Sequence, residues 1–246
     1  MQLGAQLFTV RDFTKTLDDF SETLKRIADI GYKTVQVSGS CDFEPEWLKS
    51  ELLKNGLTCT VTHRSGDKIK ANTTEEIIAH NVFGCKNIGL GWYNFNELTP
   101  KDFYNEYISA AEQICDSGLK FMFHNHRAEL KRHDNITYLE ELSSLFSPNE
   151  LSFIIDTYWL QYAGCDPAFF IRKFKNRAEC VHFKDMAYNQ DMMSVGQGNM
   201  NFEGILKSCD DANTKYIYVE QDNCNGIDPF VCLKQSYEYL KSLGLR

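Results

Sequence analysis

Four short apolar segments of the chain are each accompanied by side chains that can bind a metal ion or move a proton. The residues in question are His124, His126 and Glu129 after segment 120–123, Asp156 after 152–155, His182 within 180–185, and Glu220 after 216–219. If these segments are strands whose ends meet, their imidazole and carboxylate groups converge on one site.

The residue types suit a divalent metal ion. Glu129, Asp156, His182 and Glu220 offer three carboxylates and one imidazole, a set that leaves coordination positions open for a substrate. Such a set is typical of Mn²⁺, Zn²⁺, Co²⁺ or Mg²⁺. Any one of these residues alone would be an ordinary loop residue in contact with solvent. The four together predict a metal site, with the identity of the metal left open.

Neighbouring polar residues are candidates for catalysis. Lys184 lies two residues after His182, so both side chains face the same side of a strand. An ammonium group beside a metal can stabilise an oxyanion or carry a proton. We predict that Glu220, Glu129, His126 and Lys184 are the catalytic residues.

A further set of residues is predicted to contact the substrate. His124 stands at the end of its apolar segment, and His63 follows the third strand. Trp159 offers an apolar wall for a sugar ring, although ordinary packing explains it equally well. Gln197 lies between two glycines, in a loop that lets a ligand approach the backbone closely. His80, by contrast, lies inside a helix and is predicted to be structural.

The elements that must position these residues alternate along the whole chain. Apolar, β-branched or aromatic runs are followed by amphipathic stretches that begin with a helix cap and often end at glycine. The predicted strands are 2–9, 34–37, 57–62, 86–90, 119–123, 151–155, 179–183 and 215–219. The predicted helices are 16–30, 45–54, 74–83, 100–117, 136–145, 167–174, 202–210 and 229–243.

About eight strand–helix units in 246 residues predict a single α/β domain spanning 1–246, a (β/α)8 TIM barrel. A doubly wound open sheet is the competitor, but the turn after the first strand, residues 10–12, contains no glycine. In a TIM barrel the active site forms at the C-terminal ends of the strands, where the residues described above stand.

Charge and composition exclude several classes of function. The net charge is −8, with no run of Lys or Arg, so nucleic acid is not an expected partner. No apolar run reaches the roughly 20 residues of a membrane span, and the N-terminus lacks the pattern of a signal peptide. Nine cysteines without a Cys-x-x-Cys pair indicate free thiols. We expect a cytoplasmic protein and leave assembly into a homo-oligomer open.

The motifs, in their order and spacing, resemble those of the xylose isomerase-like TIM-barrel superfamily, specifically its sugar phosphate isomerase/epimerase branch. The resemblance spans nearly the whole chain and is strongest from the fifth strand onward. The matching motifs are Phe-His-Asn-His at 123–126, Glu129, Asp-Thr-Tyr-Trp at 156–159, Gly-Cys-Asp-Pro at 164–167, His-Phe-Lys-Asp at 182–185, Gly-Gln-Gly-Asn at 196–199 and Val-Glu-Gln-Asp at 219–222.

The resemblance implies a divalent metal that binds adjacent oxygens of a sugar or polyol and promotes proton transfer next to a carbonyl. Carried over to this chain, the ligands would be Glu129, Asp156, His182 and Glu220. Many relatives place a glutamate directly at the end of the fifth strand, where this chain has His124. Either His124 or Glu129 is therefore the first ligand.

Two further departures concern substrate binding. Relatives often have a glutamate near the end of the second strand and an acidic residue in the glycine loop, where this chain has Gln36 and Gln197. Both changes remove a charge that could act as a base or bind a hydroxyl group, so they leave the substrate and the direction of the reaction open.

The sequence thus predicts a metal-dependent sugar or sugar phosphate isomerase or epimerase that acts on a small carbohydrate or polyol by proton abstraction next to a carbonyl. The alternative enzyme is a lyase, such as a dehydratase acting on an oxidised sugar or inosose. The alternative of another class is a sugar-binding barrel without catalysis. The DNA-repair endonucleases of the superfamily would need a basic groove, which the charge of −8 disfavours.

Overall fold

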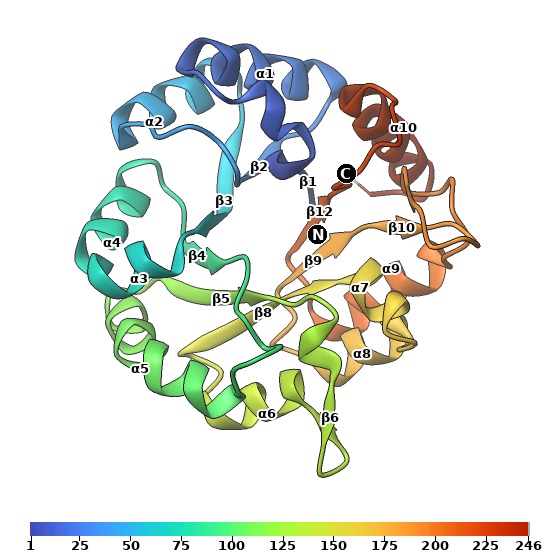
Figure 1. Ribbon diagram of the computed structural model, residues 1–246. Coiled ribbons are helices and arrows are strands. Elements are labelled where there is room, and N and C mark those ends of the chain that lie inside the picture. Colours follow the sequence, from blue (N-terminus) through green and yellow to red (C-terminus); the bar gives the residue numbers. More distant parts are fainter. Residues whose placement is uncertain (246) are drawn as a thin grey trace.

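Eight parallel strands close into a barrel in the computed structural model, which describes residues 1–245 (Figure 1). The order around the barrel is β1-β12-β9-β8-β5-β4-β3-β2, so the first and last strands pair and close it. The strands are β1 (Gln2–Gln6), β2 (Thr34–Val37), β3 (Thr58–Arg64), β4 (Asn87–Leu90), β5 (Lys120–His124), β8 (Leu151–Asp156), β9 (Cys180–Phe183) and β12 (Tyr216–Val219). The predicted TIM barrel is confirmed.

Helices surround the barrel and bury their apolar faces against it (Figure 1). The larger ones are α1 (Leu17–Ile30), α2 (Pro45–Lys54), α4 (Thr73–Val82), α5 (Pro100–Asp116), α6 (Tyr138–Leu145), α8 (Pro167–Lys173), α9 (Phe202–Ala212) and α10 (Pro229–Ser242). Their starts follow the sequence signals: in α5, Thr99 and Asp102 form a reciprocal capping box, and Pro100 occupies the first turn.

The structure adds short elements that the sequence did not predict. They are the 3₁₀ helices η1 (Leu7–Phe13) and η2 (Ala128–Leu130), the helices α3 (Gly66–Ala71) and α7 (Thr157–Tyr162), and two small hairpins, β6 (Arg132–His133) with β7 (Ile136–Thr137) and β10 (Asp185–Met186) with β11 (Met192–Met193). Each helix among them spans seven residues or fewer, too short for a clear 3.6-residue pattern.

Several predicted boundaries differ from the structure, and at two of them a capping side chain gives the reason. The first strand ends at Gln6 rather than at residue 9, since the Gln6 side chain accepts a hydrogen bond from Phe8 N (2.9 Å) and starts η1. The helix predicted at 136–145 is α6, and it starts at Tyr138 because Thr137 and Glu140 form a capping box there.

The interior of the barrel holds a small apolar cluster, separate from the larger core between strands and helices. Its members are Val61, Met122, Ile154, Cys180 and Tyr218. Each is followed two residues later by a polar side chain of the candidate site. Because side chains alternate along a strand, these polar residues also face inward, nearer the C-terminal ends of the strands.

Other predictions concern cysteines, one histidine and membrane spans. All nine cysteines, every one within the described residues, are free. His80 is buried and bonded to Thr62 and to the backbone of Glu76, so its structural role is confirmed. Within residues 1–245, no helix is both long enough and apolar enough to cross a membrane.

Candidate active site

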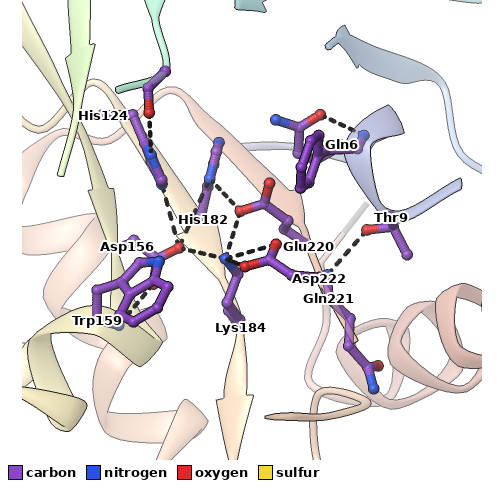
Figure 2. A network of polar contacts seen from close by, with 12 residues as sticks. Gln6, Thr9, His124, Asp156, Trp159, His182, Lys184, Glu220, Gln221 and Asp222 are labelled. Carbon is purple, nitrogen blue, oxygen red and sulfur yellow. Dashed lines mark hydrogen bonds and ion pairs between the residues drawn. The ribbon is translucent and has the colours of Figure 1, made fainter. Parts of the chain in front are cut away.

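Four buried side chains from four neighbouring strands meet at the C-terminal end of the barrel (Figure 2). His124 ends β5, Asp156 ends β8, His182 lies on β9, and Glu220 directly follows β12. One nitrogen or oxygen atom from each lies within 4.8 Å of the others. We refer to these four residues as the site cluster.

Strand register explains why these four residues meet. Asp156 is paired with His182 between β8 and β9, and His124 with Ile154 between β5 and β8. Each member of the site cluster follows an interior apolar residue by two positions. Because side chains two positions apart lie on the same face of a strand, the members of the site cluster also point toward the barrel axis.

In both histidines of the site cluster, one ring nitrogen faces a carboxylate and the other lies within hydrogen-bond distance of a carbonyl or amide oxygen. His124 Nδ1 lies 3.2 Å from the carbonyl oxygen of Gly91, and its Nε2 lies 3.3 Å from Asp156 Oδ2. His182 Nε2 lies 2.6 Å from Gln36 Oε1, and its Nδ1 lies 3.0 Å from Glu220 Oε2. Oxygen partners of this kind orient metal-binding histidines in proteins.

Asp156 uses its two oxygens for different purposes. Oδ1 accepts a hydrogen bond from Trp159 N (2.9 Å) and so caps α7, while Oδ2 faces His124 and Lys184. The backbone N–H of Asp156 donates to Asn125 Oδ1 at 3.0 Å. The turn from β8 into α7 therefore fixes the carboxylate that enters the site cluster.

Lys184 places its ammonium group among three carboxylates (Figure 2). Its Nζ lies 3.2 Å from Asp156 Oδ2, 2.9 Å from Glu220 Oε2 and 3.0 Å from Asp222 Oδ2. Burial alone would lower the pKa of Lys184, but the charges of Asp156, Glu220 and Asp222 raise it, so the amine is protonated. Lys184 and His182 face the same side of the strand, since both contact Glu220.

The donor set fits a divalent cation. Since a carbonyl oxygen only accepts, His124 Nδ1 carries the hydrogen, and Nε2 is left to face Asp156 with its lone pair unless a second proton is bound. A lone pair opposite a carboxylate is stable when a cation lies between them. In addition, the three carboxylates around Lys184 outnumber its single ammonium and leave two formal negative charges.

A cavity of about 560 Å³ opens above the site cluster. His124, Glu220, Lys184 and His63 line it, together with Trp92 from the loop after β4. His63 is half-buried, its surroundings hold its pKa well below the usual range mainly through desolvation, and its buried Nε2 has no hydrogen-bond partner among the described residues. This first cavity thus presents a metal-type donor set and a neutral imidazole to a small ligand.

Glu129 lies outside the site cluster. It follows β5 by five residues, in the short helix η2, and its Oε2 accepts a hydrogen bond from His126 N at 3.0 Å. Burial raises the pKa of Glu129 to about 7. With His126 and Trp159 it lines a second cavity of about 350 Å³, which borders the first at His126 and Trp92.

Gln197 is exposed and lines neither of these two cavities. The glycine loop around it folds onto Asp185, whose carboxylate accepts hydrogen bonds from Gly196 N, Gly198 N and Met200 N. The backbone donors that could have held a phosphate are therefore occupied by the protein itself.

The sequence analysis gave no role to Asp222 and did not foresee the contact that Gln36 makes. Asp222 forms the third ion pair of Lys184, and Gln36 binds His182. The signal for Asp222 was its position two residues after Glu220. Gln36 was noted only as the position where relatives often have a glutamate, and its contact with His182 joins strands that are 146 residues apart in the chain.

No protein-family model matches the chain. It is 26% identical to an inosose dehydratase from Clostridium beijerinckii, over 90% of this chain and 89% of that protein. A solved sugar phosphate isomerase/epimerase from Parabacteroides distasonis superimposes with a TM-score of 0.83 at 22% identity, covering 98% of this chain and 93% of the other. A solved L-ribulose 3-epimerase has a TM-score of 0.77 at 13% identity, covering 99% and 94%. The chain therefore has the fold of the xylose isomerase-like TIM barrels, the superfamily that its strand-end motifs resemble.

Proposed function

We propose that the protein is a divalent-metal-dependent enzyme that isomerises or epimerises a small carbohydrate or polyol by moving a proton next to a carbonyl. The observation that carries the proposal is the site cluster: two imidazoles and two carboxylates, all buried, with one donor atom each within 4.8 Å of the others. Two of its members, His124 and Glu220, line a cavity of about 560 Å³. Structural neighbours named as a sugar phosphate isomerase/epimerase and an L-ribulose 3-epimerase support this choice.

We assign the metal ligands as His124, Asp156, His182 and Glu220, which replaces Glu129 of the sequence-based set with His124. A bound divalent ion would polarise a carbonyl and the neighbouring hydroxyl of the substrate. The set of two nitrogens and two oxygens suits Mn²⁺, Zn²⁺ or Co²⁺ better than Mg²⁺, which prefers oxygen ligands.

Glu220 is the carboxylate best placed to take the proton. Burial alone would raise its pKa, but the charges of Lys184 and His182 hold it well below the usual range, so Glu220 is ionised. The Lys184 ammonium, 2.9 Å from Glu220 Oε2, can stabilise the enediolate oxygen that forms. His63, with its free Nε2, offers a hydrogen bond to a substrate hydroxyl.

The second candidate is a dehydratase. The inosose dehydratases at 26% identity favour it, and it starts with the same proton abstraction. It differs in the fate of the carbanion, which expels a β-hydroxyl as water instead of taking a proton back. A panel of ketoses, aldoses and inososes in D₂O separates the two by NMR: deuterium incorporation without loss of water supports the isomerase or epimerase.

The site itself is tested by metal analysis of the purified protein and of the variants Asp156→Ala and His182→Ala, with the exposed His133→Ala as control. We expect about one metal ion per chain in the unchanged protein and the control, loss of metal in both site variants, and deuterium exchange that a chelator abolishes. Stoichiometric metal that survives both substitutions would overturn the site. Sugar binding without any proton exchange would show that the protein is a sugar-binding protein and not an enzyme.

A further inference from the structure

We propose that the second cavity binds a second pyranose ring of the substrate, so that the preferred ligands are glycosides of two sugar units rather than monosaccharides. This inference rests on the proposed function, because it takes the first ring to lie over the site cluster. The second cavity joins the first at Trp92 and His126, and a ligand can therefore occupy both.

The walls of the second cavity are aromatic and well supported. Trp92, Tyr93, Tyr158, Trp159 and Tyr162 line it. The Trp159 ring packs against Tyr158 at 5.0 Å and Tyr162 at 5.8 Å between centroids. The Tyr158 hydroxyl donates to the carbonyl oxygen of Gln190 at 2.8 Å. Neighbouring groups thus hold the Trp159 and Tyr158 rings in place before any ligand arrives.

Three buried polar atoms of residues around the second cavity lack hydrogen-bond partners among the described residues. They are Glu129 Oε1, His126 Nδ1 and Trp159 Nε1. Trp159 Nε1–H can only donate, whereas His126 and Glu129 can accept. A buried polar atom left without a partner costs free energy, and a ligand with hydroxyl groups would remove this cost.

The combination of aromatic faces with donors and acceptors favours a sugar ring over an aryl group. A pyranose presents apolar C–H faces that pack on aromatic rings and carries hydroxyl groups, each of which both donates and accepts. A phenyl ring would fill the same space and leave Glu129, His126 and Trp159 unpaired. The volume of about 350 Å³ is at the small end of ligand pockets, which suits a single ring.

The two cavities also differ in the charged groups that line them. The site cluster with Lys184 and Asp222 carries the ionised groups of the first cavity. In the second, exposed Arg127 stands at the rim and Glu129, with its raised pKa of about 7, is the buried acid. The chemistry is therefore confined to the ring over the site cluster, and the second ring contributes binding energy.

The experiment compares D-glucose with maltose, cellobiose, sucrose and trehalose by titration calorimetry on the metal-loaded protein. Tryptophan fluorescence provides a second readout, because Trp92 and Trp159 line the cavity while Trp47 packs against Phe20, away from it. We expect at least one disaccharide to bind tenfold or more tightly than glucose and to change the fluorescence. Tyr162→Ala should remove that gain and leave glucose affinity unchanged, whereas the exposed Tyr188→Ala should change neither.

Each of the other possible results contradicts either the second subsite, the choice of a sugar ring as its ligand, or the proposed enzyme activity. Equal affinity for mono- and disaccharides, with proton exchange intact in monosaccharides, overturns the second subsite and leaves the proposed function standing. Phenyl glucoside binding more tightly than every disaccharide overturns the choice of a sugar ring. A disaccharide gain without proton exchange in any sugar supports the subsite and overturns the proposed enzyme. Absence of binding by all these sugars overturns the subsite.

Discussion

Lys184 is the residue on which the electrostatics of the site depend. Its ammonium contacts Asp156 Oδ2 and Glu220 Oε2, the same oxygens that face the two histidines of the site cluster. A metal bound by these oxygens would meet a positive charge a few ångströms away. Asp222 provides a third carboxylate that can keep the ammonium paired when the other two bind metal.

Replacing this lysine therefore separates metal binding from catalysis. We expect Lys184→Met to bind Mn²⁺ or Zn²⁺ about tenfold more tightly, since about 1.4 kcal/mol of charge repulsion corresponds to a factor of ten. Deuterium exchange in the substrate should fall at least a hundredfold, because the enediolate loses its ammonium partner. Calorimetric metal titration and NMR exchange measure the two effects. Lys215→Met, in an ion pair with Glu179 elsewhere, is the control. Weaker metal binding by Lys184→Met contradicts the prediction.

Among the elements, the ends of β1 and β8 are each fixed by the start of the next helix. Asp156 caps α7 while it serves the site cluster, and Gln6 caps η1 while its amide lies 3.4 Å from His63 Nδ1. In the same way His80 joins α4 to β3: its Nε2 accepts from the Thr62 hydroxyl at 2.8 Å, and its Nδ1 donates to the Glu76 carbonyl at 2.7 Å. The neutral ring satisfies both partners.

The stability of the fold should consequently depend on the protonation of His80. Burial lowers its pKa from 6.5 to about 4, against the opposing backbone hydrogen bond and charge of Glu76, while Arg64 adds to the decrease. A lowered histidine pKa stabilises the fold fully above pH 6.5, and the contribution is lost as pH falls toward 4. It amounts to about 3 kcal/mol. Urea unfolding of His80→Gln should show lower stability at pH 7 but a shallower loss between pH 6.5 and 4.

The matched control for this effect is His133→Gln, because His133 is exposed in the β6–β7 hairpin. Its unfolding free energy should follow that of the unchanged protein at every pH. Equal pH slopes for all three proteins would show that His80 does not titrate with folding.

For the molecule as a whole, the pairing of β1 with β12 closes the barrel and joins the two ends of the chain. Gly4 makes this seam tight. A Cβ at this position would clash with the ring of Tyr218 and the hydroxyl of Thr34, one on each neighbouring strand. Tyr218 in turn belongs to the apolar cluster beneath the site.

Gly4→Ala should therefore destabilise the whole barrel and not only its first strand. We expect a loss of about 1–3 kcal/mol, typical of overpacking in a core. Because the barrel closes only when every strand is in place, fluorescence and far-UV circular dichroism should report one coincident unfolding transition at a lower urea midpoint. Separate transitions, or an unchanged midpoint, would contradict this account.

The barrel, its helices and three members of the site cluster can be predicted from the amino-acid sequence alone. Those features are local: alternating apolar residues, caps such as Thr99 and glycines at helix ends mark the elements, and Asp156, His182 and Glu220 stand at or beside strand ends. Expectations about cellular location, assembly and nucleic acid stay predictions of the sequence.

The residues that complete the site, by contrast, depend on how the strands are paired in three dimensions. His124 enters the site cluster because it keeps the inward phase of β5, whereas Glu129, five residues on, follows the chain out of the strand into η2. Asp222 and Gln36 reach Lys184 and His182 across other strands. Such contacts depend on strand register and barrel closure, which bring together residues that are far apart in the chain.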